Sequence, residues 1–239
     1  MLTSDLQALL TTLQMAGLTT LILVAIGTPL AWYLANMKSR FKVIVEAVVA
    51  LPLVLPPTVL GFYLLIAFSP EHLPGQLWQQ ATGQQLAFSF SAIVIGSVLY
   101  SLPFVVQPLQ RAFEQLGDSL LEAGAVLGAG ALDRFFSIVL PLTKTSFITA
   151  ATLGFAHTVG EFGVILMIGG NIPGETRVLS IALFDHVEAF DYARAHMLSI
   201  GLLVSSMVIL AIIYWLNLTH TDKQLSPKYK QQAEHSIDD

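Results

Sequence analysis

Five long apolar stretches are the feature of this 239-residue chain that most restricts its fold. Each is long enough to cross a hydrocarbon core of about 30 Å at a rise of about 1.5 Å per residue. Only 11% of the residues are charged, whereas soluble domains have about 25%. The sequence therefore predicts an all-α, polytopic bundle of transmembrane helices. The stretches cover residues 13–37, 43–68, 87–109, 146–170 and 197–218.

The number of spans depends on the interpretation of residues 177–190. This segment is apolar in places, but it is too short to span and carries charges such as Arg177 and Asp185. It predicts a surface or re-entrant helix, which leaves five spans, with six as the alternative. The first stretch is expected to be a retained span, because no Lys or Arg precedes Lys38 and a signal peptide begins with positive charge.

The basic residues predict the orientation of the bundle. With five spans, nine of the 11 Lys and Arg residues fall on one side of the membrane, within residues 38–42, 111–144 and 223–230. Only Arg177 and Arg194 fall on the other side. Because positive residues collect in cytoplasmic loops, we expect the N-terminus outside and the C-terminus in the cytoplasm.

Composition excludes several classes of function. The formal net charge of −5 argues against a nucleic-acid partner. The absence of Cys excludes disulfides, thiolate metal sites and a Cys nucleophile. No G-x-x-x-x-G-K-[ST] sequence is present, so the chain lacks this phosphate-binding loop for ATP. We therefore expect neither an enzyme nor a cofactor in this chain.

Residues 111–144 are the most informative segment outside the spans. Two helical patterns, the first over residues 111–127, are separated by glycines. Gly128 and Gly130 permit a sharp turn, and Pro141 is expected to end the second helix before the fourth span. From the pattern alone, this hairpin could lie on the membrane surface or could present a short helix to a cytoplasmic partner.

The spacing within this segment favours the partner-binding helix. The sequence has Glu-Ala-Gly, three residues, Gly, nine residues, Ile, one residue, and then Leu-Pro. It resembles the EAA signature of ABC importer permeases, E-A-A-x3-G-x9-I-x-L-P, and departs from it only at Gly124. The resemblance implies a coupling helix between spans three and four that sits in a cleft of a separate ATP-binding subunit. The residues implied in this role are Glu122, Ala123, Gly124, Gly128, Ile138, Leu140 and Pro141.

A second part of the chain narrows the resemblance. Residues 155–163 read Phe-Ala-His-Thr-Val-Gly-Glu-Phe-Gly. Their Gly-Glu-Phe-Gly core is similar to that of sulfate and other oxyanion permeases. Residues 169–177 read Gly-Gly-Asn-Ile-Pro-Gly-Glu-Thr-Arg, and residues 185–187 read Asp-His-Val. These two segments resemble the molybdate (ModB) branch of the permeases.

The resemblance implies a permease domain over residues 1–218 of a protein in the bacterial inner membrane. Residues 219–239 lie outside it, and their composition predicts a disordered cytoplasmic tail. The implied function is ATP-driven import of molybdate by alternating access. Tungstate, sulfate and thiosulfate permeases are the alternatives, because tungstate is nearly isosteric with molybdate and the sulfate branch shares part of the motif.

The same resemblance implies several partners. Two copies of this chain would sit over two ATP-binding subunits, which bind the ATP and the Mg. A periplasmic oxyanion-binding protein would deliver the anion and would dock on residues 69–86 and 171–194. For Arg177 and Arg194, the basic residues of that side, a docking salt bridge and a solvated surface charge stay open.

Ionisable side chains in the fourth stretch mark candidate pathway residues. His157 and Glu161 are four residues apart, so a continuous helix would place them on one face. They could form a structural pair, or they could line the pathway or its gate. A metal site is disfavoured because no third ligand is visible, and Glu161 is expected to support the fold where glycines can break the helix. The candidate pathway residues are His157, Gly160, Glu161, Phe162 and Gly163.

Two features concern the second and third stretches. Glu46 follows Lys42 by four residues and is expected to pair with it or to reach the membrane interface. Several prolines interrupt the backbone hydrogen bonding there, and they could mark packing kinks or a cavity. These prolines are Pro52, Pro56, Pro57, Pro103 and Pro108.

Overall fold

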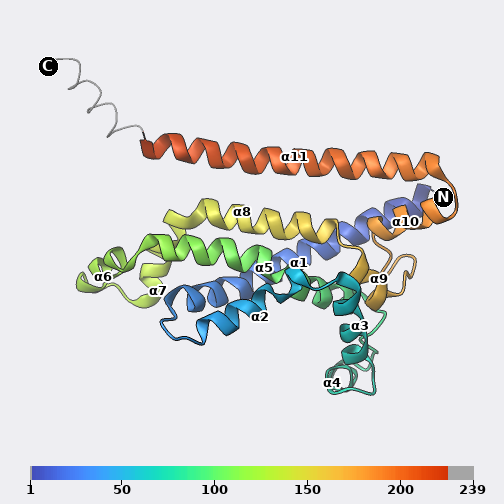
Figure 1. Ribbon diagram of the computed structural model, residues 1–239, viewed down its shortest axis with the longest axis horizontal. Coiled ribbons are helices and arrows are strands. Elements are labelled where there is room, and N and C mark those ends of the chain that lie inside the picture. The colour runs from blue at the N-terminus through green and yellow to red at the C-terminus, as the bar shows by residue number, and fades with distance from the viewer. Residues whose placement is uncertain (1, 226–239) are drawn as a thin grey trace, which may run out of the picture.

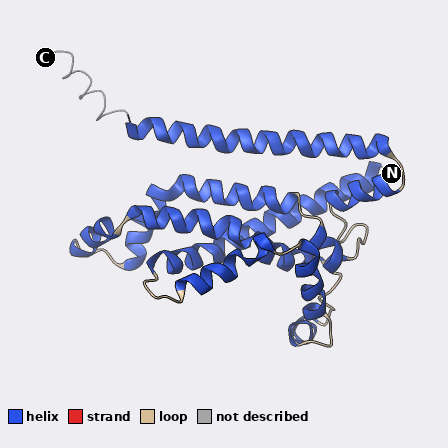
Figure 2. Ribbon diagram, viewed as in Figure 1, coloured by secondary structure: helices blue, strands red, loops and turns tan. Residues whose placement is uncertain are grey.

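The computed structural model describes residues 2–225 and contains, within them, helices and no β-strand (Figure 1 and Figure 2). This confirms the predicted all-α bundle. In chain order the elements are α1 (Leu2–Asn36), α2 (Lys42–Val54), α3 (Pro57–Phe68), α4 (Leu73–Thr82), α5 (Phe90–Leu116), α6 (Asp118–Val126), α7 (Ala131–Arg134), the π-helix η1 (Phe135–Val139), α8 (Leu140–Val159), α9 (Gly163–Gly169), α10 (Leu179–Glu188) and α11 (Tyr192–Leu225).

Four helical segments are long and apolar enough to cross a membrane: α1, α5, the continuous α7–η1–α8, and α11. Together, α2 and α3 make a fifth, but they meet at an angle of 109°. The bend follows from Pro56 and Pro57, because proline has no amide hydrogen and disfavours helical geometry in the residue before it. Pro57 then begins α3, where a missing amide hydrogen has little cost. The second predicted span therefore consists of two helices that meet at a bend and is not one continuous helix.

The fourth span differs from its predicted bounds of 146–170. The helix runs without interruption from Ala131 through η1 and ends at Val159, so the prediction that Pro141 ends a helix is wrong. The wider π turn explains how the proline is accommodated. The amide of Leu140 donates to the carbonyl of Phe135, five residues back, and this turn leaves room for the proline ring that follows.

The predicted helix over residues 111–127 is also wrong. Helix α5 continues from the third span to Leu116, and the backbone then turns at Gly117, where φ is +69°. Glycine adopts this conformation without the steric cost of a Cβ atom. Helix α6 begins again at Asp118. A corner therefore joins the third span to the rest of residues 111–144, which we call the predicted coupling segment.

Helix α5 lies at the centre of the bundle and packs against α1, α2, α8 and α9. One buried cluster includes Ile93 of α5 and Ile168 of α9. A second joins Val105 and Leu109 of α5 to Leu23 of α1. Helix α11 packs on α10 and, over part of its length, on α8 (Figure 1), and much of its apolar surface is uncovered within one chain.

Two further predictions concern the C-terminal third. Residues 177–190 were expected to contain a surface or re-entrant helix, and α10 (Leu179–Glu188) lies there against α1 and α11. Helix α11 continues to Leu225, so residues 219–225 are helical where the sequence predicted a disordered tail. The rest of that predicted tail, residues 226–239, lies outside the described residues.

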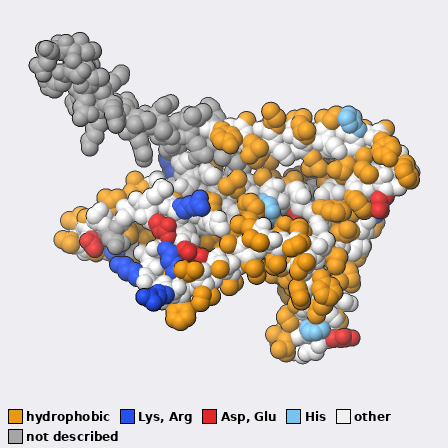
Figure 3. All heavy atoms as spheres, viewed as in Figure 1, with side chains coloured by type: hydrophobic (Ala, Val, Ile, Leu, Met, Phe, Trp, Pro, Cys, Tyr) orange, Lys and Arg blue, Asp and Glu red, His pale blue; other side chains and the backbone are white. Residues whose placement is uncertain are grey.

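Basic side chains gather at one end of the bundle, which Figure 3 shows and which we call the basic end. The turn before α2 and the end of α5 meet there, because Nζ of Lys42 lies 2.7 Å from Oε1 of Glu114. The predicted pairing of Lys42 with Glu46 is present at 3.8 Å. The tip of the predicted coupling segment, residues 117–130, also lies at this end, which the charge distribution predicts to be cytoplasmic.

Candidate functional site

The predicted coupling segment folds into a helical hairpin at the basic end, with α6 as its first arm and α7–η1 as its second. The turn between them contains Gly128 with φ of +87°. The amides of Gly128 and Ala129 donate to the carbonyls of Ala125 and Gly124, both at 3.0 Å. Gly130 has φ of −67°, so of the two glycines predicted to form the turn, only Gly128 occupies the region that favours glycine.

The two arms of the hairpin pack closely at Gly124. A Cβ atom at this position would lie 2.9 Å from Cδ1 of Ile138 and 3.3 Å from Cγ and Cδ of Arg134. Arg134 also donates from Nη1 to the carbonyl of Leu121 at 3.1 Å. The one departure from the EAA spacing therefore falls where the arms are in contact. The missing methyl group lets α6 lie against η1.

The outer surface of the hairpin is strongly apolar. Glu122 and Ala123 are exposed beside it on α6. An exposed apolar patch of this kind marks a contact with another protein or with lipid. We call this surface the apolar tip; its residues are between 46% and 87% exposed and are Leu120, Val126, Leu127, Leu132 and Phe136.

The structure divides the seven residues of the predicted coupling site into two groups. It places Glu122, Ala123, Gly124 and Gly128 on α6 and the turn, with Ile138 behind Gly124. The other two residues of the signature, at positions 140 and 141, begin α8 and belong to the span. The signature therefore covers both the tip and the start of the helix that leaves it.

His157, in the last turn of α8, lies among side chains of α5. Its Nδ1 atom is 2.8 Å from Oγ of Ser101. The ring stacks on Phe104 with centroids 4.0 Å apart and lies 4.9 Å from the ring of Tyr100. These contacts hold the imidazole at the α5–α8 contact, between aromatic rings and one hydroxyl group.

Glu161 does not share a helix face with His157, so that prediction is wrong. Helix α8 ends at Val159, and Glu161 lies in the break before α9, where the sequence predicted that glycines could interrupt the helix. Its side chain is 4% exposed, and neither carboxylate oxygen has a hydrogen-bond partner among the described residues. The Ser97 hydroxyl lies beside this carboxylate but donates to Sδ of Met15 at 3.7 Å.

The break before α9 faces the bend between α2 and α3. A Cβ atom on Gly163 would lie 2.9 Å from Cβ of Pro57. One turn further, a Cβ atom on Gly61 would lie 2.8 Å from Cβ of Met167 and 3.3 Å from Cα of Val164. Two interrupted helices thus meet through glycines, and α3 and α9 form one tightly packed pair. We call it the α3–α9 pair.

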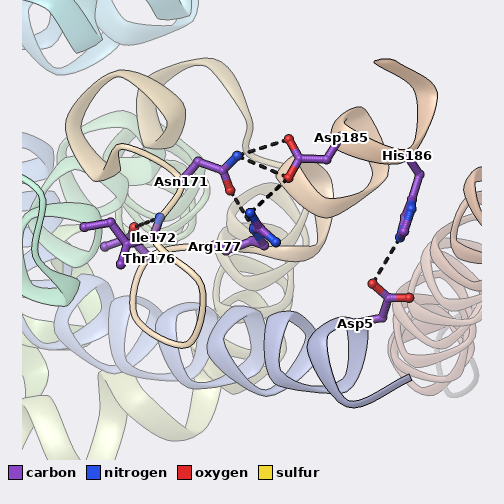
Figure 4. A network of polar contacts seen from close by, with 7 residues as sticks. All are labelled: Asp5, Asn171, Ile172, Thr176, Arg177, Asp185 and His186. Carbon is purple, nitrogen blue, oxygen red and sulfur yellow. Dashed lines mark hydrogen bonds and ion pairs between the residues drawn. The ribbon is translucent and has the colours of Figure 1, made fainter. Parts of the chain in front are cut away.

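The loop after α9 is held by polar contacts that Figure 4 shows. Nε of Arg177 donates to Oδ1 of Asn171 at 2.7 Å, and Nη2 of Arg177 lies 3.4 Å from Oδ2 of Asp185. The Asn171 amide group donates to both carboxylate oxygens of Asp185, at 3.0 and 3.1 Å. These three residues, which we call the loop clamp, fasten the loop to α10.

Other hydrogen bonds attach the same loop to α9. Oγ1 of Thr176 donates to the carbonyl of Gly169 at 2.6 Å. The same oxygen accepts from the amide of Ile172 at 2.9 Å, as Figure 4 shows. Oγ of Ser180 donates to the carbonyl of Glu161 at 2.6 Å. Both ends of the short helix α9 are therefore bonded to the segment that follows it.

The two basic residues opposite the basic end pair within the chain. Arg177 belongs to the loop clamp, and Arg194 lies 3.3 Å from Asp191. At the N-terminus of α1, Oδ1 of Asp5 accepts a hydrogen bond from Nε2 of His186 at 3.1 Å (Figure 4). The sequence left open a docking salt bridge or a solvated charge for the two arginines, and the structure gives each an intramolecular partner.

The clamp predicts a measurable effect of Asp185→Ala. Loss of the Asp185 carboxylate leaves Arg177 and Asn171 without their shared acceptor. For partly exposed groups this lowers the stability of the closed loop by about 1 kcal/mol. We expect trypsin to cleave after Arg177 about fivefold faster in sealed vesicles that present this loop. Glu188→Ala, on the exposed side of the same helix, is the matched control. Equal cleavage rates in the two variants would contradict the clamp.

No three His, Asp or Glu side chains that could hold a metal ion lie together among residues 2–225. The site that the sequence missed is a pair of cavities on α5. One has a volume of about 430 Å³ and the other of about 190 Å³, and both are lined by Gln107 and Arg111. The only sequence signal for it is the pair of polar residues near the end of an apolar span.

Comparison with known proteins identifies the family. The model of the binding-protein-dependent transport system inner membrane component matches residues 27–220. The chain belongs to this family. The permease chain is 56% identical over 210 residues to the molybdenum transport system permease protein ModB of Azotobacter vinelandii, which covers 88% of this chain and 93% of that protein.

A more distant relative and a solved structure of the same fold accompany this match. The permease chain is 34% identical over 187 residues to the sulfate transport system permease protein CysT of Synechocystis sp., covering 78% of this chain and 65% of that protein. A bacterial alginate ABC transporter, crystallised in complex with an alginate pentasaccharide-bound periplasmic protein, has a chain of the same fold. The TM-score is 0.65 at 16% identity, over 93% of this chain and 79% of that one. The predicted resemblance to importer permeases of the ModB type is confirmed.

Proposed function

We propose that this chain is the permease subunit of an ATP-driven importer that moves molybdate across the bacterial inner membrane. The identity of 56% to the Azotobacter vinelandii ModB carries the proposal, because it covers nearly the whole of both chains. The identity to the sulfate permease is 34%, over a smaller share of each chain. Sulfate is therefore the second candidate, and tungstate is expected to share the site with molybdate.

The apolar tip supports a separate ATP-binding subunit as partner. Its exposed side chains offer a surface that would fill a cleft in another protein. The arm α7 continues through η1 into α8 without a break, up to Val159. A push on the tip would therefore travel as a rigid-body movement to the middle of the bundle. Because each chain has one such hairpin, two copies would serve two ATP-binding subunits, which would bind the ATP and the Mg.

The opposite end supports docking of a periplasmic anion-binding protein. Residues 69–86, which contain α4, extend away from the bundle (Figure 1). The loop clamp fixes the second predicted docking segment, residues 171–194. Alternating access would then use the α3–α9 pair as a unit, since it lies between this loop and the end of α8. Closure of the ATP-binding subunits would open the pathway outward, and hydrolysis would reset it inward.

The test is uptake of radiolabelled molybdate at limiting concentration in cells with and without the gene for this chain. We expect deletion to abolish high-affinity uptake, and we expect excess tungstate but not sulfate to compete in wild-type cells. Unchanged molybdate uptake together with lost sulfate uptake would assign the chain to sulfate. Unchanged uptake of both anions would contradict an oxyanion importer.

A further inference from the structure

Two neighbouring cavities follow one face of α5 from the basic end. The first, of about 430 Å³, lies between α5 and α2, with Glu46 and Glu114 in its wall. The second, of about 190 Å³, lies further along α5 and is lined by Phe104. Gln107 and Arg111 line both cavities, so the two are adjacent. We call them together the α5 groove.

The groove follows α5 from the basic end toward the middle of the helix. From Glu114 to Phe104, α5 rises by about 15 Å, which is half of a hydrocarbon core of about 30 Å. The groove reaches Phe104, whose ring stacks on that of His157. Beyond this point the bundle is filled by the buried cluster around Ile93 and Ile168. The groove therefore extends from the charged residues of the basic end to the Phe104 ring that stacks on His157.

The charges in the groove leave one cation available. Glu114 accepts hydrogen bonds from Lys42 at 2.7 Å and from Gln110 at 2.9 Å. Glu46 accepts from Gln110 at 2.6 Å and lies 3.8 Å from Lys42. The exposed side chain of Arg111 interacts electrostatically with Glu114, but its guanidinium makes neither a hydrogen bond nor an ion pair within 4.0 Å among the described residues. Arg111 is therefore a cation in the wall of both cavities whose donors are not bonded to another described side chain.

We propose that the α5 groove is the cytoplasmic half of the anion path, and that Arg111 and the Gln107 amide bind the tetrahedral oxyanion before its release. The proposal rests on the proposed function and adds a binding site to it. A guanidinium donates two parallel hydrogen bonds to an oxyanion. Glu46 and Glu114 in the same wall offset part of this attraction. Binding is then weak enough for the anion to leave, as conduction requires.

The first test is transport by the complete importer, reconstituted in liposomes with its ATP-binding subunit and anion-binding protein. We expect Arg111→Gln to lower the initial rate of molybdate uptake about tenfold, and Arg111→Lys to lower it less, because Lys keeps the charge but not the paired donors. Arg40→Gln is the matched control. It removes an exposed arginine at the basic end that lines neither cavity, and we expect wild-type uptake.

The outcomes separate this proposal from the proposed function. If the wild-type importer takes up no molybdate, the proposed function fails. If the wild type transports molybdate and Arg111→Gln matches Arg40→Gln, the groove site is overturned and the proposed function stands.

The second test measures occupancy of the groove directly. Because the chain has no Cys, a thiol reagent labels only the cysteine that is introduced. In the reconstituted importer, Gln107→Cys is labelled with an anionic methanethiosulfonate reagent, and the labelled chain is quantified by mass. We expect millimolar molybdate to slow labelling several-fold and to have no effect once Arg111→Gln is added. Val48→Cys, on an exposed part of α2 outside the groove, is expected to show no protection.

Lipid headgroups carry a similar oxyanion, so the labelling is repeated in vesicles of phosphatidylcholine with and without phosphatidylglycerol. Protection by molybdate in both kinds of vesicle supports the proposal. A labelling rate that follows the phosphatidylglycerol content and ignores molybdate assigns Arg111 to a lipid phosphate and overturns it.

Discussion

Gly128→Thr is expected to insert into the membrane as the wild type does and to lose nearly all molybdate uptake. Gly128 has φ of +87° and nothing within 4 Å of its Cβ position, so the effect comes from the backbone alone. A left-handed conformation costs an ordinary residue about 1–2 kcal/mol, and a β-branched residue more. The turn would relax to another geometry, which would displace the apolar tip from the position set by the contact at Gly124.

Gly130→Thr is the matched control for this variant. Gly130 lies two residues away, also has nothing within 4 Å of its Cβ position, and has a φ of −67° that Thr adopts readily. As the residue before α7 it accepts Thr about as well as Gly. We therefore expect wild-type uptake and normal co-purification of the ATP-binding subunit. Uptake that is equal in the two variants would show that the geometry of the turn is unimportant for coupling.

The spans could be predicted from the sequence because their cause is local. Inside a bilayer, the backbone hydrogen bonds must be satisfied within the segment, so a long apolar stretch folds into a helix. The bend at Pro56 and Pro57 is local as well, since the missing amide hydrogen belongs to the residue itself. The turn at Gly128 was predictable for the same reason, because a glycine between two amphipathic patterns marks a reversal of the chain.

The errors occurred where distant contacts decide the geometry. The sequence placed His157 and Glu161 on one helix face, but the helix ends at Val159. Two contacts accompany this break: Gly163 packs on Pro57, and Ser180 bonds to the carbonyl of Glu161. Neither contact can be read from the spacing within the fourth stretch. The helix expected to end at Pro141 continues because a π turn makes room, which residue propensities do not indicate.

The candidate sites divide in the same way. The hairpin that the sequence predicts to be the coupling site could be recognised because its residues lie within one segment at fixed spacing. The loop clamp joins Asn171 to Asp185, and the α5 groove joins α2, α5 and α8, so their partners become neighbours only in the folded bundle. Single polar residues near the end of an apolar span, such as Gln107 and Arg111, are ambiguous until a cavity appears beside them.

Gly61→Ala is expected to weaken the α3–α9 pair and to lower transport. Its Cβ atom would lie 2.8 Å from Cβ of Met167 and 3.3 Å from the backbone of Val164. Neither is the end of a flexible side chain, so the two helices must move apart. Overpacking of this kind costs about 1–3 kcal/mol. We expect the unfolding temperature of the purified importer in detergent to fall by about 3–8 °C, together with a loss of uptake.

Gly17→Ala is the control, because Gly17 lies in α1 with nothing within 4 Å of its Cβ position. Ala favours helix over Gly by up to about 1 kcal/mol, so this variant should unfold no earlier than the wild type. Equal unfolding temperatures for the two variants would contradict the close contact at Gly61. Uptake per folded importer then distinguishes two roles of the pair. If it is unchanged in Gly61→Ala, the contact serves stability alone; if it falls, the two interrupted helices must move together for the anion to pass.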